Sequence, residues 1–151
     1  MNYIGRWVFH SIGIFGDDGL VYYNAEDFMT SPMLYIEEND TEAVADEIKE
    51  RKNIIGTVVK VCDDGKLYML MPIPEGVSKE DVDAAAAMGE IKLCDGMLYE
   101  NYIAWEDRDG ELWYDTGIEG EAFGEMTESW EKAIDDEGFF VLMNIRFVKA
   151  D

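Results

Sequence analysis

His10 is the only histidine in the 151-residue chain, and an imidazole can act as a general base or bind a haem iron. A catalytic cysteine–histidine pair would need Cys62 or Cys94 beside it, which spacing along the chain cannot establish. Because His10 sits within an apolar stretch, we expect a structural strand residue. The two cysteines form no C-x-x-C pair, so we expect free, buried thiols and no disulfide.

Acidic residues collect at four turns that could bind Ca²⁺ if two of them converged. These turns lie at residues 17–19, 63–65, 107–110 and 135–138. None has EF-hand spacing, because the 107–110 turn carries its glycine at the fourth position instead of the sixth. Other acidic pairs, for which no spacing demands a glycosidase cleft, are Glu119 with Glu121 and Glu106 with Asp115. The sequence therefore predicts solvated turns, with no metal ion and no cofactor.

The dipeptide Asp-Gly recurs before aromatic or β-branched stretches and divides the chain into strands. It occurs at residues 18–19, 64–65, 95–96 and 109–110, with Glu137-Gly138 as a variant. Aspartate tolerates left-handed backbone and glycine has no Cβ, so the pair suits type I′ hairpin turns. These regularly placed turns predict an antiparallel up-and-down β-meander.

The periodicity predicts about eight or nine strands and two short helices. Strands are expected at residues 5–15, 20–23, 54–61, 66–71, 90–93, 97–105, 111–118, 121–126 and 139–148. Capping residues predict helices at residues 40–52 and 78–88, residues 24–39 read as loop or short helix, and residues 129–133 as a helical turn. Several strands are apolar on both faces, which favours a barrel over a sandwich. The fold class is thus mainly β, a single β-barrel domain spanning residues 1–151.

The net charge of −22 constrains the partners. We expect no nucleic acid as a partner, and the same charge repulsion disfavours anionic membrane surfaces, because both bind proteins through cationic side chains. No stretch approaches the roughly 20 apolar residues of a membrane span, and residues 1–14 lack a basic leader. We expect a cytoplasmic protein, or a secreted one if an upstream signal segment is missing from this chain.

Gly5-Arg6-Trp7 forms a G-x-W on the first strand, and Arg146 lies on the last. This pair resembles the lipocalins and the wider calycin group of up-and-down barrels, in particular uncharacterised bacterial lipocalin-like proteins. The resemblance implies that the first and last strands are neighbours. It also implies that Arg146 packs across the indole of Trp7 in the barrel floor, closing the barrel together with Gly5.

The resemblance implies non-covalent binding of a small apolar or amphipathic molecule inside the barrel. Aromatic and methionine side chains would line such an interior, because methionine adapts to irregular apolar ligands. The predicted ligand-binding residues are Phe9, Tyr68, Met69, Met71, Tyr99, Trp105, Tyr114 and Met143. The same residues also suit a solid core without a cavity.

Two alternatives stay open. A calycin-type enzyme, such as a decarboxylase or isomerase, would need a buried arginine or paired tyrosines and a carboxylate of raised pKa. The chain has only four arginines, which lowers the expectation of catalysis. The second alternative is a homodimeric interaction module without a ligand, in which the helices and apolar strand faces form an interface.

Overall fold

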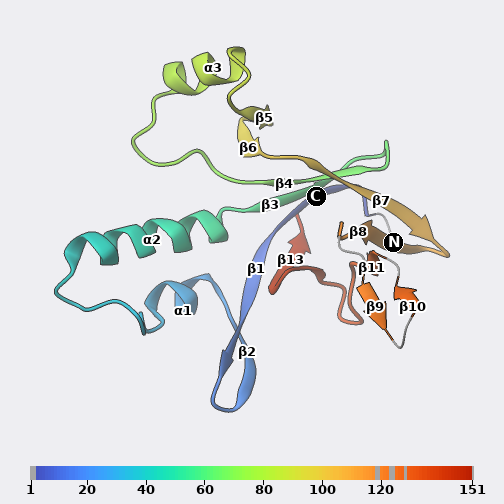
Figure 1. Cartoon of the computed structure of the whole chain (residues 1–151), viewed down its shortest axis with the longest axis horizontal. Helices are drawn as coiled ribbons and strands as arrows, with labels where there is room; N and C mark the ends of the chain where they lie inside the picture. The colour runs from blue at the N-terminus through green and yellow to red at the C-terminus, as the bar shows by residue number, and fades with distance from the viewer. Residues whose placement is uncertain (1–2, 118–119, 123–124, 128, 151) are drawn as a thin grey trace.

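The computed structural model describes residues 3–117, 120–122, 125–127 and 129–150. It is mainly β, with three helices at one side of a curled antiparallel sheet (Figure 1). The strands of the main sheet are β1 Gly5–Gly16, β2 Gly19–Tyr23, β3 Val58–Val61, β4 Lys66–Leu70, β7 Tyr102–Arg108, β8 Glu111–Asp115, β11 Trp130–Lys132, β12 Phe140–Leu142 and β13 Ile145–Lys149. Two separate hairpins are β5 Lys92–Cys94 with β6 Met97–Tyr99, and β9 Gly120–Ala122 with β10 Glu125–Thr127. The helices are α1 Ala25–Thr30, α2 Thr41–Ile55 and α3 Lys79–Ala87.

The nine-stranded sheet has the order β11-β8-β7-β4-β3-β1-β13-β12, with β2 paired to β1. It curls into a half-barrel, and its two end strands are linked through Ala133. The Ala133 amide donates to the Leu112 carbonyl of β8 at 2.9 Å, and its carbonyl accepts from the Val141 amide of β12 at 2.8 Å. Except for β1 and β13, strands that are neighbours in the sheet follow one another in the chain, and the helices and the two separate hairpins lie in the connections between them. The predicted antiparallel meander of barrel type is therefore confirmed.

The Asp-Gly turns do not share one geometry. At Asp95-Gly96 and Asp109-Gly110 both residues have positive φ, which is the mark of the predicted type I′ turn. At residues 63–65 and 136–138 only the glycine has positive φ, and each turn has three residues. Three-residue hairpins end in a left-handed glycine, so here Gly65 and Gly138 are needed for closing the loop. The type I′ prediction is wrong for these turns, and also at Asp18-Gly19, where only the glycine has positive φ and pairs with Gly16 across a two-residue loop.

The helices begin at the caps that the sequence indicates. Asp40 and Ser78 accept hydrogen bonds from the amides of Ala43 and Asp81 at the starts of α2 and α3. α2 continues to Ile55, so the strand predicted from residue 54 begins only at Val58. Residues 130–132, predicted as a helical turn, form strand β11 against β8. Among the described residues, no helix is long and apolar enough to cross a membrane.

The two ends of the chain meet as neighbouring strands, as the lipocalin resemblance implies. β1 pairs with β13, with Trp7 opposite Lys149 and Phe9 opposite Phe147. Trp7 and Phe147 are fully buried on the inner face of the sheet. Arg146 is next to Phe147 in the strand and therefore points to the outer face. The predicted packing of Arg146 across Trp7 is wrong.

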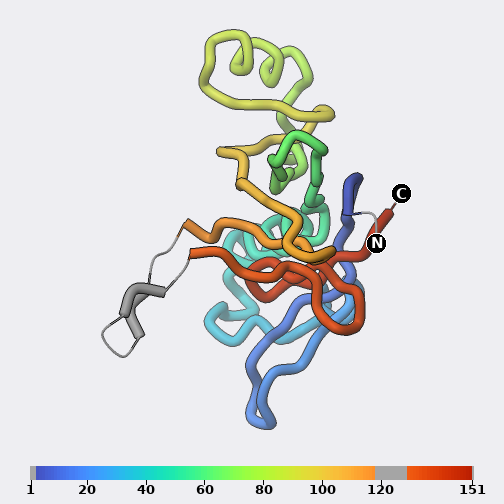
Figure 2. The backbone as a smooth tube through the Cα atoms, turned by 90° about the vertical axis from the view of Figure 1, so that its right-hand side faces the viewer, coloured from blue at the N-terminus to red at the C-terminus, as the bar shows by residue number. Residues whose placement is uncertain are grey.

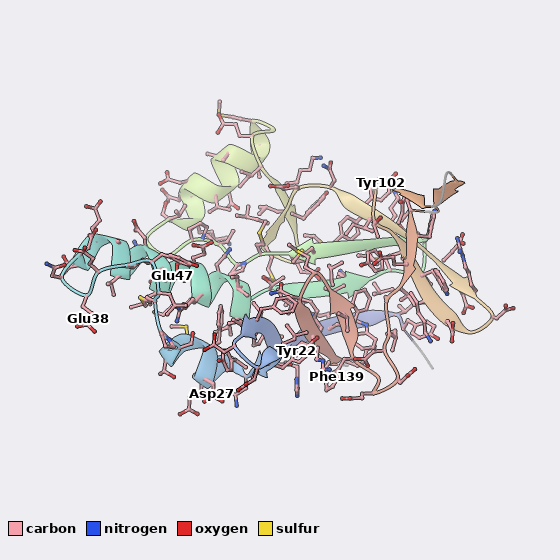
Figure 3. All side chains as sticks on the ribbon, turned by 60° about the horizontal axis from the view of Figure 1, so that its bottom comes forward. Tyr22, Asp27, Glu38, Glu47, Tyr102 and Phe139 are labelled. Carbon is pink, nitrogen blue, oxygen red and sulfur yellow. The ribbon has the colours of Figure 1, made fainter. Side chains whose placement is uncertain are left out.

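Trp7 and Arg146 each contact other aromatic rings instead of one another. The Trp7 indole packs 5.6 Å from the ring of Phe140 and donates a hydrogen bond to the Tyr3 carbonyl. The Arg146 guanidinium lies 3.6 Å from the ring centre of Tyr22 on β2 and 5.1 Å from that of Phe139. Figure 3 labels Tyr22 and Phe139 on the side of the sheet where this contact forms. Arg146 thus fastens β2 to β13 on the outside of the barrel.

Candidate functional site

Four of the predicted ligand-binding residues belong to the inner face of the sheet. Phe9, Met69 and Trp105 are partly buried and pack against the core, and Tyr114 lies within the core itself. The neighbouring interior positions are filled by side chains with less than 2% exposure, namely Trp7, Phe140, Phe147, Leu67, Leu112, Val59 and Val61. The interior therefore serves as the hydrophobic core of the protein.

The other four lie elsewhere. Tyr68 sits between two core-facing residues of β4, so it points to the outer face, where its ring meets that of Tyr99 edge-on at 5.0 Å. Burial there raises the pKa of Tyr68. Met71 follows β4 and pairs with Leu98 of β6. Met143 is the first residue of the turn between β12 and β13 and is 76% exposed. The interior positions predicted for Tyr68, Tyr99 and Met143 are wrong.

His10 occupies a β-bulge between Phe9 and Ser11, which brings two consecutive polar side chains together. Its Nδ1 lies 2.9 Å from the Ser11 hydroxyl, and its ring is 4.5 Å from that of Phe139. Ser11 is only 3% exposed, so the hydroxyl is shielded from any incoming substrate. The contact resembles a serine–histidine pair in composition but lacks the accessible nucleophile that catalysis needs.

Both cysteines are free, as predicted, although they are half-buried rather than buried. Burial raises the pKa of the Cys62 thiol. The Cys94 Sγ lies 3.9 Å from the Nζ of Lys60, which also binds Asp95 at 2.8 Å. Neither sulfur contacts the imidazole of His10 in the described hydrogen bonds, so a cysteine–histidine pair is not assembled.

The acidic turns use their carboxylates locally. Asp107 accepts from the Gly110 amide, and Asp135 accepts from the amides of Glu137 and Phe139. In the ranges that the structure describes, no three histidine, cysteine or acidic residues come together in a way that could hold a metal ion. Of the acidic pairs, Glu106 bonds to Arg108. Glu119 lies outside the described residues, as does the side chain of Glu121.

The largest of the described cavities is a groove outside the barrel, which we call the α2 groove. It measures about 550 Å³ and runs between the C-terminal half of α2 and the segment that follows β4. Its lining residues are Lys49, Glu50, Lys52, Asn53, Gly56, Pro72, Ile73, Pro74 and Glu75. In Figure 1 the two walls correspond to the end of α2 near β3 and the loop leading from β4 to α3.

The residues of α2 that face the groove follow helical periodicity. Lys49, Lys52 and Asn53 recur at three- and four-residue steps along α2, the cap residue Gly56 continues that side, and Glu50 lines the groove beside them. The helix end lies close to the opposite wall at Gly56, where a Cβ atom would come within 2.9 Å of the Pro72 ring. Glycine at position 56 therefore permits the close approach that forms the base of the groove.

The groove has one apolar wall and one charged wall. The Pro-Ile-Pro segment supplies one wall, and Lys49, Glu50 and Lys52 stand on the other. The ammonium group of Lys52 bridges the opening to Glu75 at 3.6 Å, with both side chains more than half exposed. An exposed pair of this kind is weak, at about 0–1 kcal/mol, so a ligand could displace it. The groove can thus receive a molecule with an apolar body and a charged head group.

No protein-family model, no curated protein and no solved structure matches this chain. The lipocalin resemblance therefore stays a prediction that depends on the G-x-W residues. The fold itself is independent of that resemblance, because it follows from the strand pairing described above.

Sequence reasoning did not find the α2 groove because its two walls are distant in the sequence. One signal was present in the helix: Lys49, Arg51 and Lys52 concentrate three of the twelve basic residues in a chain of net charge −22. A second was the Pro-Ile-Pro segment, whose rings give a rigid apolar wall without backbone donors. Neither signal reveals that the two segments come together in space.

Proposed function

We propose that the protein binds a small amphipathic anion, such as a medium-chain carboxylate, non-covalently in the α2 groove. The observation that carries this proposal is the volume of about 550 Å³ together with a lining in which proline and isoleucine side chains lie beside two lysines and two glutamates. Sites for small molecules commonly enclose about 300–1,000 Å³ and pair apolar walls with a few polar groups. An acyl chain would lie along Pro72, Ile73 and Pro74.

The positive groups of the groove favour an anionic head group. Lys49 and Lys52 line the groove together with Glu50 and Glu75, and among the ion pairs of the described residues Glu75 pairs with Lys52 alone. A carboxylate between the two ammonium groups would replace that exposed pair with charge-assisted hydrogen bonds. The strongly acidic remainder of the protein would repel polyanions, which restricts the ligand to small molecules with one charge.

We place the ligand in the groove instead of the barrel interior because core side chains occupy the interior positions. Binding is also favoured over catalysis. The groove lining contains no histidine, cysteine, serine or tyrosine that could act as a nucleophile. The two carboxyl groups of the described residues whose pKa is clearly displaced, Asp95 and Asp115, are both shifted down, whereas the enzyme alternative requires one raised.

Isothermal titration calorimetry with dodecanoate below its micellar concentration tests the proposal. We expect saturable one-to-one binding that weakens about fivefold or more in Lys52→Glu, because charge reversal removes an attraction and adds a repulsion. Lys79→Glu, on the exposed start of α3, makes the same change in net charge at a residue that does not line the groove and is the matched control. Equal weakening in both variants would mean that only overall charge matters, and the groove would be discarded.

A second variant fills the groove without changing its charge. Asn53→Trp places a large ring between the helix and the Pro-Ile-Pro wall, and we expect it to abolish dodecanoate binding while the thermal midpoint stays within a few degrees. Unchanged affinity in this variant would assign the binding to another part of the protein.

A further inference from the structure

β2 is an edge strand with one free side. Within the described residues it is hydrogen-bonded to β1 alone. Gly16 pairs with Gly19 across a two-residue loop, so this pair exchanges the closing hydrogen bonds, and the bonding then alternates along the hairpin. The amides of Val21 and Tyr23 consequently point toward β1, while those of Leu20 and Tyr22 point to the free side.

The free side of β2 lacks the usual protection of an edge. The strand sequence Gly-Leu-Val-Tyr-Tyr has no charge and no proline, which are the devices that normally prevent another strand from pairing. Its apolar side chains are open to solvent: Leu20 is 44% and Val21 43% exposed, and Phe15 beside them is 83% exposed. Both views of the backbone show the β1–β2 hairpin projecting from the rest of the molecule (Figures 1 and 2).

Acidic residues flank the strand at both ends. Asp17 and Asp18 precede it in the hairpin turn, and Glu26 and Asp27 follow it in the first turn of α1. Figure 3 shows Asp27 at the outside of the molecule. The nearby cation Arg146 lies over the ring of Tyr22, on the face of the sheet and not along its edge. A segment that paired with β2 would therefore meet negative charge at each of its ends.

We propose that β2 docks an extended segment of a cationic partner protein, which adds to the sheet as a further antiparallel strand. The segment has about five alternating β-branched or apolar residues with lysine or arginine at both ends. Main-chain hydrogen bonds to Leu20 and Tyr22 supply the pairing, and the flanking charges supply the selectivity. This site is distinct from the α2 groove and does not depend on the function proposed for it.

Charge decides between this partner and a second copy of the chain. Antiparallel self-pairing centred on Val21 would bring the acidic turn of one copy beside the acidic helix start of the other. Like charges facing each other across strands are destabilising, and each copy carries a net charge of −22. A strand with basic residues at its ends would instead be attracted by the acidic residues on either side of β2.

The experiment uses a fluorescein-labelled peptide of two lysines, Val-Thr-Val-Thr-Val and two lysines, measured by fluorescence anisotropy with the full chain. We expect saturable binding that weakens as sodium chloride rises, and no binding of the peptide with four glutamates in place of the lysines. Leu20→Pro removes an outward amide but leaves the ladder to β1 intact, and we expect at least about tenfold weaker binding. Leu20→Ala keeps that amide and is the matched control, expected to stay within about threefold.

Amide hydrogen exchange of the wild-type chain gives a readout that needs no variant. On adding the lysine peptide, exchange should slow at Leu20 and Tyr22, whereas Val21 and Tyr23 should change little. Unchanged exchange at Leu20 and Tyr22, or equal binding of the glutamate peptide, would overturn the proposal. A dimer that protects the same two amides without peptide would also overturn it and identify a second copy as the occupant.

Discussion

The inner face of the sheet and the elements attached outside it are held by different forces. Inside, residues such as Trp7, Phe140 and Phe147 are fully buried and exclude water. Outside, apolar burial at Val58 and Leu70 is joined by contacts from cations: Arg51 holds the segment between α1 and α2, Lys60 holds the β5–β6 hairpin and Arg146 holds β2. The hydrophobic interior is thus insensitive to pH and salt, whereas the attachments respond to both.

The interior and the attached elements contribute differently to the folding free energy. Apolar burial contributes about 25 cal/mol per Å², so the interior supplies most of the folding free energy. An exposed ion pair contributes about 0–1 kcal/mol, and only a buried, multiply bonded arginine exceeds that. Both proposed binding regions, the α2 groove and the β2 edge, belong to the attached elements, where ligand-induced rearrangement costs little.

The largest effect is expected for Trp7→Ala. The indole is 1% exposed and its removal leaves a cavity beside Phe140, so we expect a loss of about 3–5 kcal/mol in unfolding free energy at any pH between 5 and 8. Trp113→Ala is the matched control, because that ring lies outside against the Arg108 guanidinium. Urea denaturation followed by circular dichroism measures both. Equal losses at the two positions would contradict the assignment of inner and outer faces.

Arg51→Met should have an intermediate effect. Arg51 is 5% exposed, and its guanidinium donates to the carbonyls of Phe28, Ser31 and Pro32. The methionine keeps the aliphatic stem but leaves these carbonyls without their donor, so we expect a loss of about 2–3 kcal/mol. Limited proteolysis should then cut first within residues 28–40.

The matched control for Arg51→Met is Glu47→Gln, which removes only the ion pair at 3.0 Å. Because Glu47 is partly exposed, its change should cost less than about 1 kcal/mol. A larger loss for Glu47→Gln than for Arg51→Met would show that the ion pair, and not the carbonyl contacts, holds the segment.

Much of the interior could be predicted from the sequence, because alternation and turn residues are local signals. The β-meander and the caps of α2 and α3 follow from them, whereas the pairing of the first and last strands was expected from the lipocalin resemblance. The face assignment along β1 is an exception. Trp7 faces the core, but beyond the bulge at His10 the core-facing residue is Ile12, so the inner face changes from odd to even positions. A single extra residue in one strand leaves no mark in the hydrophobic pattern.

The attachments could not be predicted because their partners are remote in sequence. Arg146 was expected over an indole, yet strand alternation turns it outward to Tyr22, whose position depends on how the β1–β2 hairpin bends. Lys60 meets Asp95 only because β5–β6 folds back over β3. Likewise, Tyr68 and Tyr99 were expected inside, and their outward contact depends on that same hairpin. Contacts of this kind follow from tertiary geometry, which residue types alone do not encode.

The smallest effect is expected for Asp95→Asn, which separates charge from backbone geometry. Asp95 accepts from Lys60 at 2.8 Å and from Arg6 at 3.1 Å, and the hydrogen bond from Lys60 is the main cause that holds the pKa of Asp95 below its ordinary value of 3.8. Asparagine accepts the left-handed φ of 53° as readily, so the type I′ turn is kept. The substitution therefore removes only the charge.

Because the pKa of Asp95 is lower in the folded protein, its contribution to stability is present above pH 3.8 and is lost as the pH falls through the folded value. We expect Asp95→Asn to lower the urea midpoint slightly at pH 7, and the difference from wild type to disappear as the pH falls below the lowered pKa of Asp95 and to shrink in 1 M sodium chloride. Urea is the suitable denaturant because it adds no ions. A difference that persists at low pH and high salt would mean that Asp95 acts through the shape of its turn, and the contrast between a salt-insensitive interior and salt-sensitive attachments would then fail at this hairpin.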